Sequence, residues 1–205
     1  MNTNYDNEIE ETLKNNLGKK VLLHSCCAPC SSYVITYLTK FVNVTVLYYN
    51  PNIFPEEEYN KRKKEQIRFI NSIKSEYTVD YMDCDYDNES FEKVIKGLEN
   101  EPERGKRCTK CFDLRLSKTA LTAKENNYDF FCTTLTLSPY KNAKLINEIG
   151  FELEKEYDIK YLPSDFKKRD GYKKSIELSK IYNLYRQNYC GCIYSKRRDM
   201  ILWKI

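Results

Sequence analysis

The chain has 205 residues, of which 41% are hydrophobic and 14% aromatic, enough for a buried core, which excludes wholesale disorder. With 34 Lys and Arg against 30 Asp and Glu, the net charge of +4 excludes a purely electrostatic nucleic-acid binder but not a local basic face. No apolar run approaches the roughly 18–20 residues that cross a bilayer, and residues 1–11 are polar and acidic, unlike a secretory signal. We therefore expect a cytoplasmic protein without a membrane segment.

Strands and helices alternate along the predicted chain. After a helix at 8–17, strands are predicted at 20–24, 42–49, 77–82, 128–137 and 159–162. Helices are predicted at 31–41, 55–75, 88–98, 108–126, 138–157 and 170–187, the fifth with Ser138 as its cap and Pro139 as its first residue. This alternation predicts a Rossmann-like three-layer α/β/α sandwich with a parallel sheet, whose sites lie beyond the carboxyl ends of the strands.

One catalytic domain is expected over residues 1–205. It comprises the N-terminal helix, a core at about 20–165, and a C-terminal helical part at about 166–205. We find no internal repeat and no linker rich in Gly and Ser that would mark a second domain.

Nine cysteines are the strongest chemical signal in the sequence. A reducing compartment argues against a disulfide framework, so this number indicates metal binding or thiol chemistry. Seven of the nine fall in three motifs: Cys26-Cys27-Ala-Pro-Cys30 after the first strand, Cys108-Thr-Lys-Cys111 at a helix start, and Cys190-Gly-Cys192 near the end. Because a helix start favours the thiolate, the first two motifs predict a metal or redox site.

Three interpretations of these motifs remain open from the residues alone. In the first, the thiolates of Cys27, Cys30, Cys108 and Cys111 bind one structural zinc ion. In the second, four thiolates bind an iron–sulfur cluster, which places looser demands on their spacing. A thioredoxin-like disulfide uses Cys27 and Cys30 alone, but it leaves Cys26 and the second CxxC motif unexplained.

Other reactive residues are expected to be structural. His24, the only histidine, lies in the first strand, and we interpret it as a buried histidine rather than a ligand. Cys84 and Cys132 follow or lie within strands and are expected to pack inertly. The basic run at 61–64 is interpreted as a solvated helix face.

Two further basic runs, at 167–169 and 196–198, flank the last predicted helix together with several tyrosines. Aromatic side chains beside Lys and Arg are typical of sites that stack unpaired bases and bind phosphates. We expect a phosphate-binding rim, and Tyr140 or Tyr172 near an unpaired nucleotide; the rim residues are Lys167, Lys168, Arg169, Arg197 and Arg198.

Several motifs in this order resemble the QueH family of epoxyqueuosine reductases. They are His24-Ser-Cys-Cys-Ala-Pro-Cys30, Gly105-Lys-Arg-Cys-Thr-Lys-Cys111 with Arg115 and Leu116, Thr133-Thr-Leu-Thr-Leu-Ser-Pro-Tyr-Lys141, Asp170-Gly-Tyr172 and Tyr185-Arg-Gln-Asn-Tyr-Cys-Gly-Cys192. The resemblance runs from about residue 20 to 200. It implies a fold like the adenine-nucleotide α-hydrolases, a 4Fe-4S cluster, a nearby single iron and no cobalamin.

The same resemblance implies a reaction and roles for the cysteines. The epoxide of epoxyqueuosine, at the wobble position of tRNA, is reduced by two electrons from an external donor in the last step of queuosine biosynthesis. Cys26, Cys27, Cys108 and Cys111 are then similar to cluster ligands, Cys30 to a ligand of the cluster or of the adjacent iron, and Cys190 and Cys192 to a redox-active disulfide pair. The rival hypotheses are a zinc-stabilised nucleic-acid-binding protein and a thiol–disulfide oxidoreductase.

Overall fold

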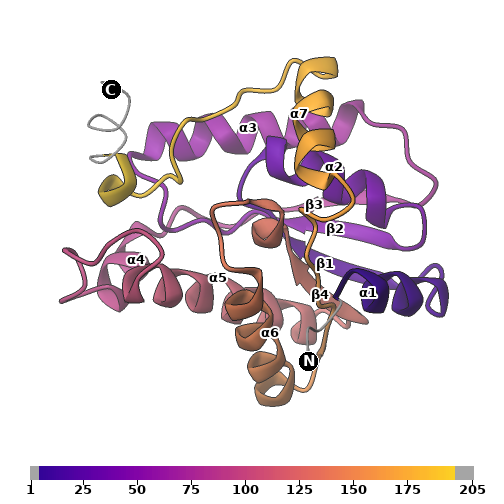
Figure 1. Cartoon of the computed structure of the whole chain (residues 1–205), viewed down its shortest axis with the longest axis horizontal. Helices are drawn as coiled ribbons and strands as arrows, with labels where there is room; N and C mark the ends of the chain where they lie inside the picture. The colour runs from indigo at the N-terminus through magenta and orange to yellow at the C-terminus, as the bar shows by residue number, and fades with distance from the viewer. Residues whose placement is uncertain (1–4, 197–205) are drawn as a thin grey trace.

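Five parallel strands form one sheet in the computed structural model, which describes residues 5–196 (Figure 1). Along the sheet the order is β3-β2-β1-β4-β5, so β1 is central. The strands are β1 (Lys20–His24), β2 (Asn43–Leu47), β3 (Val79–Met82), β4 (Phe130–Thr133) and β5 (Lys160–Tyr161). This arrangement confirms the predicted Rossmann-like parallel sheet.

Helices cover both faces of the sheet (Figure 1). One face packs against α1 (Tyr5–Lys14), α2 (Ala28–Leu38) and α3 (Glu56–Ser72), and α7 (Gly171–Ile181) packs on α2. On the other face lie α5 (Lys106–Glu125) and α6 (Ala143–Tyr157), while α4 (Asn88–Val94) packs on α5. Within residues 5–196, we find no helix that is both long and apolar enough to cross a membrane.

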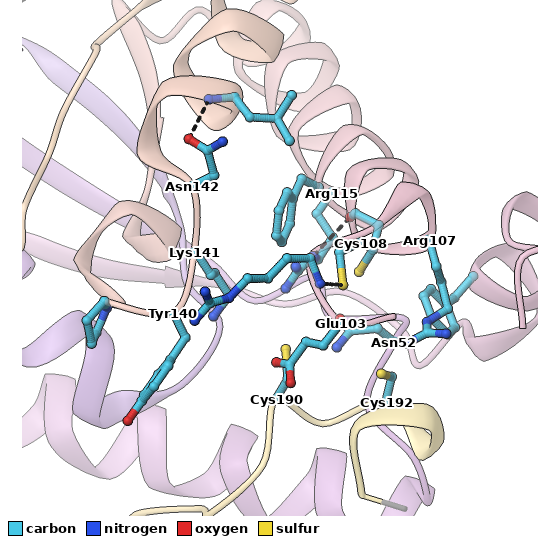
Figure 2. Close-up of a pocket in the computed structure, with 16 residues that line it drawn as sticks. Asn52, Glu103, Arg107, Cys108, Arg115, Tyr140, Lys141, Asn142, Cys190 and Cys192 are labelled. Carbon is cyan, nitrogen blue, oxygen red and sulfur yellow. Dashed lines mark hydrogen bonds between the residues drawn. The ribbon is translucent and has the colours of Figure 1, made fainter. Parts of the chain in front are cut away.

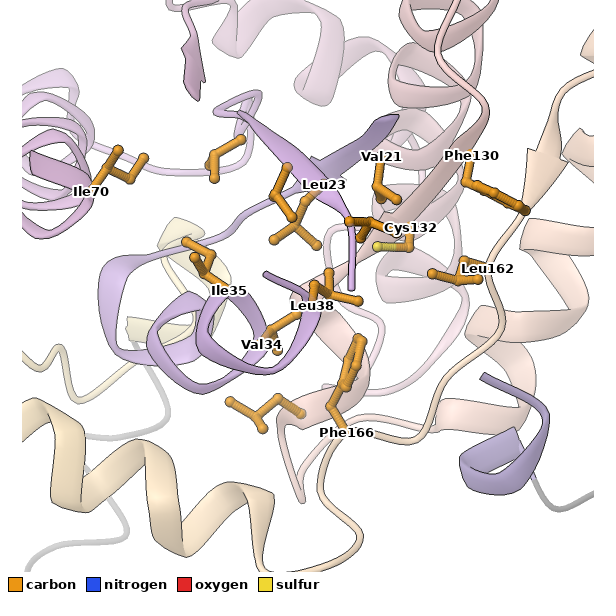
Figure 3. Close-up of a cluster of buried hydrophobic side chains, with 14 of the residues drawn as sticks. Val21, Leu23, Val34, Ile35, Leu38, Ile70, Phe130, Cys132, Leu162 and Phe166 are labelled. Carbon is orange, nitrogen blue, oxygen red and sulfur yellow. The ribbon is translucent and has the colours of Figure 1, made fainter. Parts of the chain in front are cut away.

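Strand β1 supplies side chains to both cores because successive residues of a strand point to opposite faces. Val21 and Leu23 pack toward α2, as Figure 3 shows, whereas Leu22 packs toward α5 and α6. All three are fully buried, which is the pattern of a central strand covered on both faces.

The structure corrects the predicted segment that follows the fourth strand. Here β4 ends at Thr133, opposite the last residue of β1, and a 3₁₀ turn follows, η1 (Thr134–Leu137). The Thr133 hydroxyl accepts a hydrogen bond from the backbone N–H of Leu135, which bends the chain away from the sheet. Accordingly α6 begins at Ala143, capped by the Asn142 side chain, so the predicted helix start at Ser138 and Pro139 is wrong.

The C-terminal part contains less helix than predicted. Helix α7 ends at Ile181 and not at residue 187. Asn183 adopts a left-handed conformation, with φ of 48°, and the chain continues without helix through residues 182–192. This irregular segment, which we call the C-terminal strap (residues 182–192), carries Cys190 and Cys192. The assignment of the whole chain to a single domain stays a prediction.

Candidate active site

Three cysteines converge at the turn between β1 and α2. The sulfur atoms of Cys26, Cys27 and Cys30 all lie within 4.8 Å of one another. The turn brings them together because Cys27 is the N-cap of α2 and Cys30 lies in its first turn. In the part of the chain that the structure describes, no other group of three or more His, Cys, Asp or Glu ligand atoms is this compact. We call Cys26, Cys27 and Cys30 the turn cysteines.

The turn cysteines are arranged to share a negative charge. Hydrogen bonds from Cys27 and Cys30 hold the pKa of Cys26 well below its usual value. The hydrogen bond to Cys26 raises the pKa of Cys27 to about 12, and Cys26 likewise raises the pKa of Cys30. The Gln187 side-chain amide donates to the Cys27 sulfur at 2.9 Å. One thiolate surrounded by donors is a strong nucleophile or metal ligand.

Four other cysteines line a cavity of about 300 Å³ (Figure 2). Cys108 and Cys111 come from the first turns of α5, and Cys190 and Cys192 come from the C-terminal strap. Cys111 and Cys192 are each only 7% exposed. Burial raises the pKa of Cys111 to about 12 and also raises the pKa of Cys108 and of Cys192. We call these four residues the pocket cysteines.

Two cations connect the turn cysteines with the pocket cysteines. Arg115, one helical turn after Cys111, and Lys141, just before α6, both line the cavity. Burial lowers the pKa of each cation, but the negative charge that the neighbouring cysteines carry when ionised outweighs burial, so the pKa of Arg115 and that of Lys141 are raised. Cys26 and Cys190 act on both cations. Only the pocket cysteines line the cavity together with these cations, and the turn cysteines act on them from outside its lining.

Helix α3 holds the C-terminal strap in place. Arg62 donates to the carbonyl oxygen of Cys190 at 3.2 Å and to the Glu58 carboxylate at 2.8 Å. Gly191 has φ of 126° and packs tightly, since a Cβ there would lie 2.9 Å from Ile53 and 3.2 Å from Arg62. Only glycine therefore fits between the two strap cysteines.

Arg62 also corrects an expectation from the sequence. Its basic run was predicted to be a solvated face, yet Arg62 is only 2% exposed. A buried Arg in this run is explained by its partners, because Glu58 lies one helical turn before it and the strap covers it. The strap lies far away in sequence, so the run itself held no signal for this role.

The predicted substrate-binding residues lie in different places. Tyr140 is 63% exposed at the cavity rim, where the Arg104 guanidinium lies 5.9 Å from its ring centre. By contrast, Arg169 pairs with Asp6 and Glu10 of α1. The cavity lining does not include Tyr172, Lys167, Lys168 or Arg169. Arg197 and Arg198 lie outside the described residues. Binding of tRNA phosphates by these basic residues stays a prediction.

The remaining reactive residues are mostly structural. His24 is fully buried, and its ring nitrogens face the Thr133 hydroxyl at 2.9 Å and the Tyr49 carbonyl at 3.2 Å. Burial lowers its pKa to about 3, which confirms a neutral core histidine. Cys132 is fully buried in the core, as expected. Cys84 packs against the core on the α5 and α6 side, as expected, but it is only partly buried and also borders a second cavity.

Sequence reasoning did not assign Arg115 and Lys141 to the site, although both lie in the motifs noted above. The spacing of Arg115 from Cys111 held a signal, because residues four apart share a helix face. The sequence around Lys141 gave no such signal, because the position of Lys141 depends on the 3₁₀ turn that replaces the end of the predicted strand.

The fold and site define a Rossmann-like α/β protein with a thiol-rich centre beyond the carboxyl ends of its parallel strands. A crystal structure of a predicted tRNA methyltransferase subunit from Methanocaldococcus jannaschii is similar in fold alone. Its TM-score is 0.50 at 14% identity, over 79% of this chain and 74% of that chain.

Closer relatives exist at the level of sequence. An epoxyqueuosine reductase QueH of Staphylococcus epidermidis is 47% identical over 90% of this chain and 79% of its own length. Another, of Streptococcus pyogenes, is 43% identical over 97% and 80%. The family model for epoxyqueuosine reductase QueH matches residues 21–198. The chain belongs to the QueH family of epoxyqueuosine reductases, which confirms the resemblance and favours the reductase over both rival hypotheses.

Proposed function

We propose that this chain reduces epoxyqueuosine in tRNA to queuosine, using iron held by its cysteine thiolates. The observation that carries this proposal is the cavity that the pocket cysteines share with Arg115 and Lys141, together with the compact group of turn cysteines, of which Cys26 raises the pKa of both cations. Converting an epoxide to an alkene consumes two electrons and two protons and releases one water. The thiols of these two groups are suited to electron transfer, because thiolates bind redox-active iron.

The donor atoms at the site fit an iron–sulfur cluster. Cys26, Cys27, Cys108 and Cys111 would hold it, and Cys30 would bind the cluster or an adjacent iron. Buried polar atoms without a partner in the described residues also occur around the cysteines, in Asn52, Arg62, Arg107, Arg115 and Gln187. Such atoms are expected where a bound group or water completes the site. When bound, the cluster supplies electrons one at a time, and the proposal includes no cobalamin.

Cys190 and Cys192 are proposed to act as a redox-active pair that receives electrons from an external donor. Both line the cavity, and both are free thiols in the structure. Gly191 between them supplies the backbone conformation that the tight strap requires. Their position beside Cys108 and Cys111 supports an exchange of electrons between the pair and the metal site.

The substrate is proposed to be a cytoplasmic tRNA whose wobble nucleotide enters the cavity past Tyr140. The exposed ring of Tyr140, with Arg104 beside it, suits stacking on an unpaired base. Lys167, Lys168, Arg169, Arg197 and Arg198 are proposed to contact phosphates farther along the tRNA.

Anaerobic reconstitution with iron and sulfide, followed by an assay on tRNA carrying epoxyqueuosine, tests this function. We expect a brown protein that converts the tRNA to its queuosine form when a reductant is present. A Cys84→Ser variant is the matched control, because Cys84 borders a different cavity and should leave colour and activity unchanged. A colourless protein that binds only zinc would contradict the cofactor, and a brown protein without conversion would contradict the reaction.

A further inference from the structure

Arg115 and Lys141 carry positive charge into the cavity, and part of this charge has no partner among the described residues. Arg115 is only 1% exposed, and its Nε donates to the Cys111 carbonyl at 3.1 Å. One of its terminal amino groups, Nη2, is buried without a hydrogen-bond partner. Lys141 has no ion pair and no side-chain hydrogen bond to any of residues 5–196. A buried cation without a partner is costly, and Lys141 beside Arg115 is itself only partly exposed, so this pair indicates a ligand.

The cysteines compensate only part of the positive charge of Arg115 and Lys141. Cys26 and Cys190 act on both cations, but none of the nine cysteines accepts a hydrogen bond from the unpartnered Arg115 amino group. A tRNA phosphate is a better partner for Arg104, which is exposed at the cavity rim, than for Arg115, which is only 1% exposed. The missing partner is therefore an atom of the nucleotide that enters the cavity.

Resting on the proposed function, we infer that Arg115 and Lys141 bind the epoxide oxygen of the substrate and that Lys141 protonates it. Two electrons from the donor enter as both C–O bonds break and the C=C bond forms, and the oxygen leaves as water. Lys141 gives this oxygen one of its two protons; solvent gives the other and then reprotonates Lys141.

The two side chains differ in what they contribute. A guanidinium keeps its proton throughout, so Arg115 is confined to hydrogen bonding and to stabilising the charge on the departing oxygen. An ammonium combines the same charge with a transferable proton, which makes Lys141 the proton donor. His24 is not available for this step, because both of its ring nitrogens face protein partners in the core.

Binding without turnover separates this contact from electron transfer. The reconstituted enzyme is titrated anaerobically, without reductant, with the epoxide form and with the queuosine form of the same tRNA. The wild-type enzyme should prefer the epoxide form by roughly tenfold, the worth of one charge-assisted hydrogen bond. Lys141→Met should reduce this preference several-fold, because only Arg115 is left to bind the oxygen, and Lys141→Arg should retain it. The matched control Lys144→Met, on exposed α6 surface, should leave it unchanged.

Turnover and iron content complete the test. With reductant, Lys141→Met should lower kcat by about 100-fold, and Lys141→Arg should remain slow although it binds the epoxide form normally. Iron content should equal that of the wild type in both variants. Wild-type binding without preference, a Lys141→Met variant that keeps the preference undiminished, or iron loss in step with activity would each overturn the inference. If wild-type enzyme with full iron converts no tRNA, the proposed function itself fails.

Discussion

Cys26, Cys27 and Cys30 come from five consecutive residues, whereas the pocket cysteines come from the start of α5 and from the distant C-terminal strap. The geometry of the turn cysteines follows from a strand end and a helix start that are adjacent in sequence. The pocket cysteines meet because the strap is held by α3, through Arg62, Glu58 and Glu65, and by the backbone of Phe54 just before α3. The first group is therefore a local structure, and the second depends on tertiary contacts.

This difference shows which substitutions can displace each group of cysteines. The turn cysteines are held mainly by one another, and only two of their partners come from distant segments, Thr134 of η1 and Gln187 of the strap. The pocket cysteines can be displaced by substitutions in α3, because its residues hold the backbone of the strap that carries Cys190 and Cys192. The predictions below test this contrast, from the largest expected effect to the smallest.

Replacing Cys26 should have the largest effect. In a Cys26→Ser variant the thiolate at the centre of the turn cysteines is lost, and serine does not replace a cluster ligand. We expect the iron–sulfur absorbance and the reduction of epoxyqueuosine to fall to background, as measured after anaerobic reconstitution. Full absorbance and activity in this variant would remove Cys26 from the proposed ligand set.

The double variant Cys190→Ser/Cys192→Ser should separate the strap cysteines from the metal. If they form the redox pair, the variant keeps its iron absorbance but loses about 100-fold in multiple turnovers with a dithiol donor. A chemical one-electron reductant should restore a single turnover, because the proposed ligands remain. Loss of iron in proportion to activity would assign both residues to the metal site.

Arg62→Leu should destabilise the fold and release the strap. It leaves the Glu58 carboxylate, whose side chain is 13% exposed, without its buried partner. We expect the free energy of unfolding to fall by about 3 kcal/mol. Alkylation should accelerate at Cys190 more than at Cys26, as measured by mass spectrometry.

Arg68→Gln is the control for Arg62→Leu, because Arg68 also bonds the strap from α3 but is 48% exposed. It should cost less than about 1 kcal/mol. Equal acceleration at Cys190 and Cys26 in Arg62→Leu would show that the two cysteine groups are not held independently.

Arg169→Gln should have the smallest effect, since α1 contacts neither cysteine group. Hydrogen bonds from Arg169 and Lys14 lower the pKa of Glu10 from 4.5 to about 2. The carboxylate therefore stabilises the fold above about pH 4.5, and this stabilisation is lost as the pH falls toward 2. The variant should raise the pKa of Glu10 in an NMR titration and leave iron binding unchanged. An unchanged titration would show that this pairing is absent in solution.

Sequence reasoning located the cysteine motifs but misplaced the segment that carries Lys141. A continuous strand was predicted through Leu137 because these residues are apolar or β-branched. In the structure β1 ends at His24, so β4 has no partner for pairing beyond Thr133. Strand length is set by the neighbouring strand, which a single stretch of sequence does not reveal.

By itself, the sequence determined the alternation of strands and helices, the parallel sheet and the turn cysteines, because hydrophobic periodicity and short spacings are local properties. Only the tertiary structure decided that Arg62 is buried, that the strap lies on α3, and that Arg115 and Lys141 point into one cavity. These features join segments far apart in the chain. Their positions depend on how helices pack across the sheet, and no local pattern of residues encodes that packing.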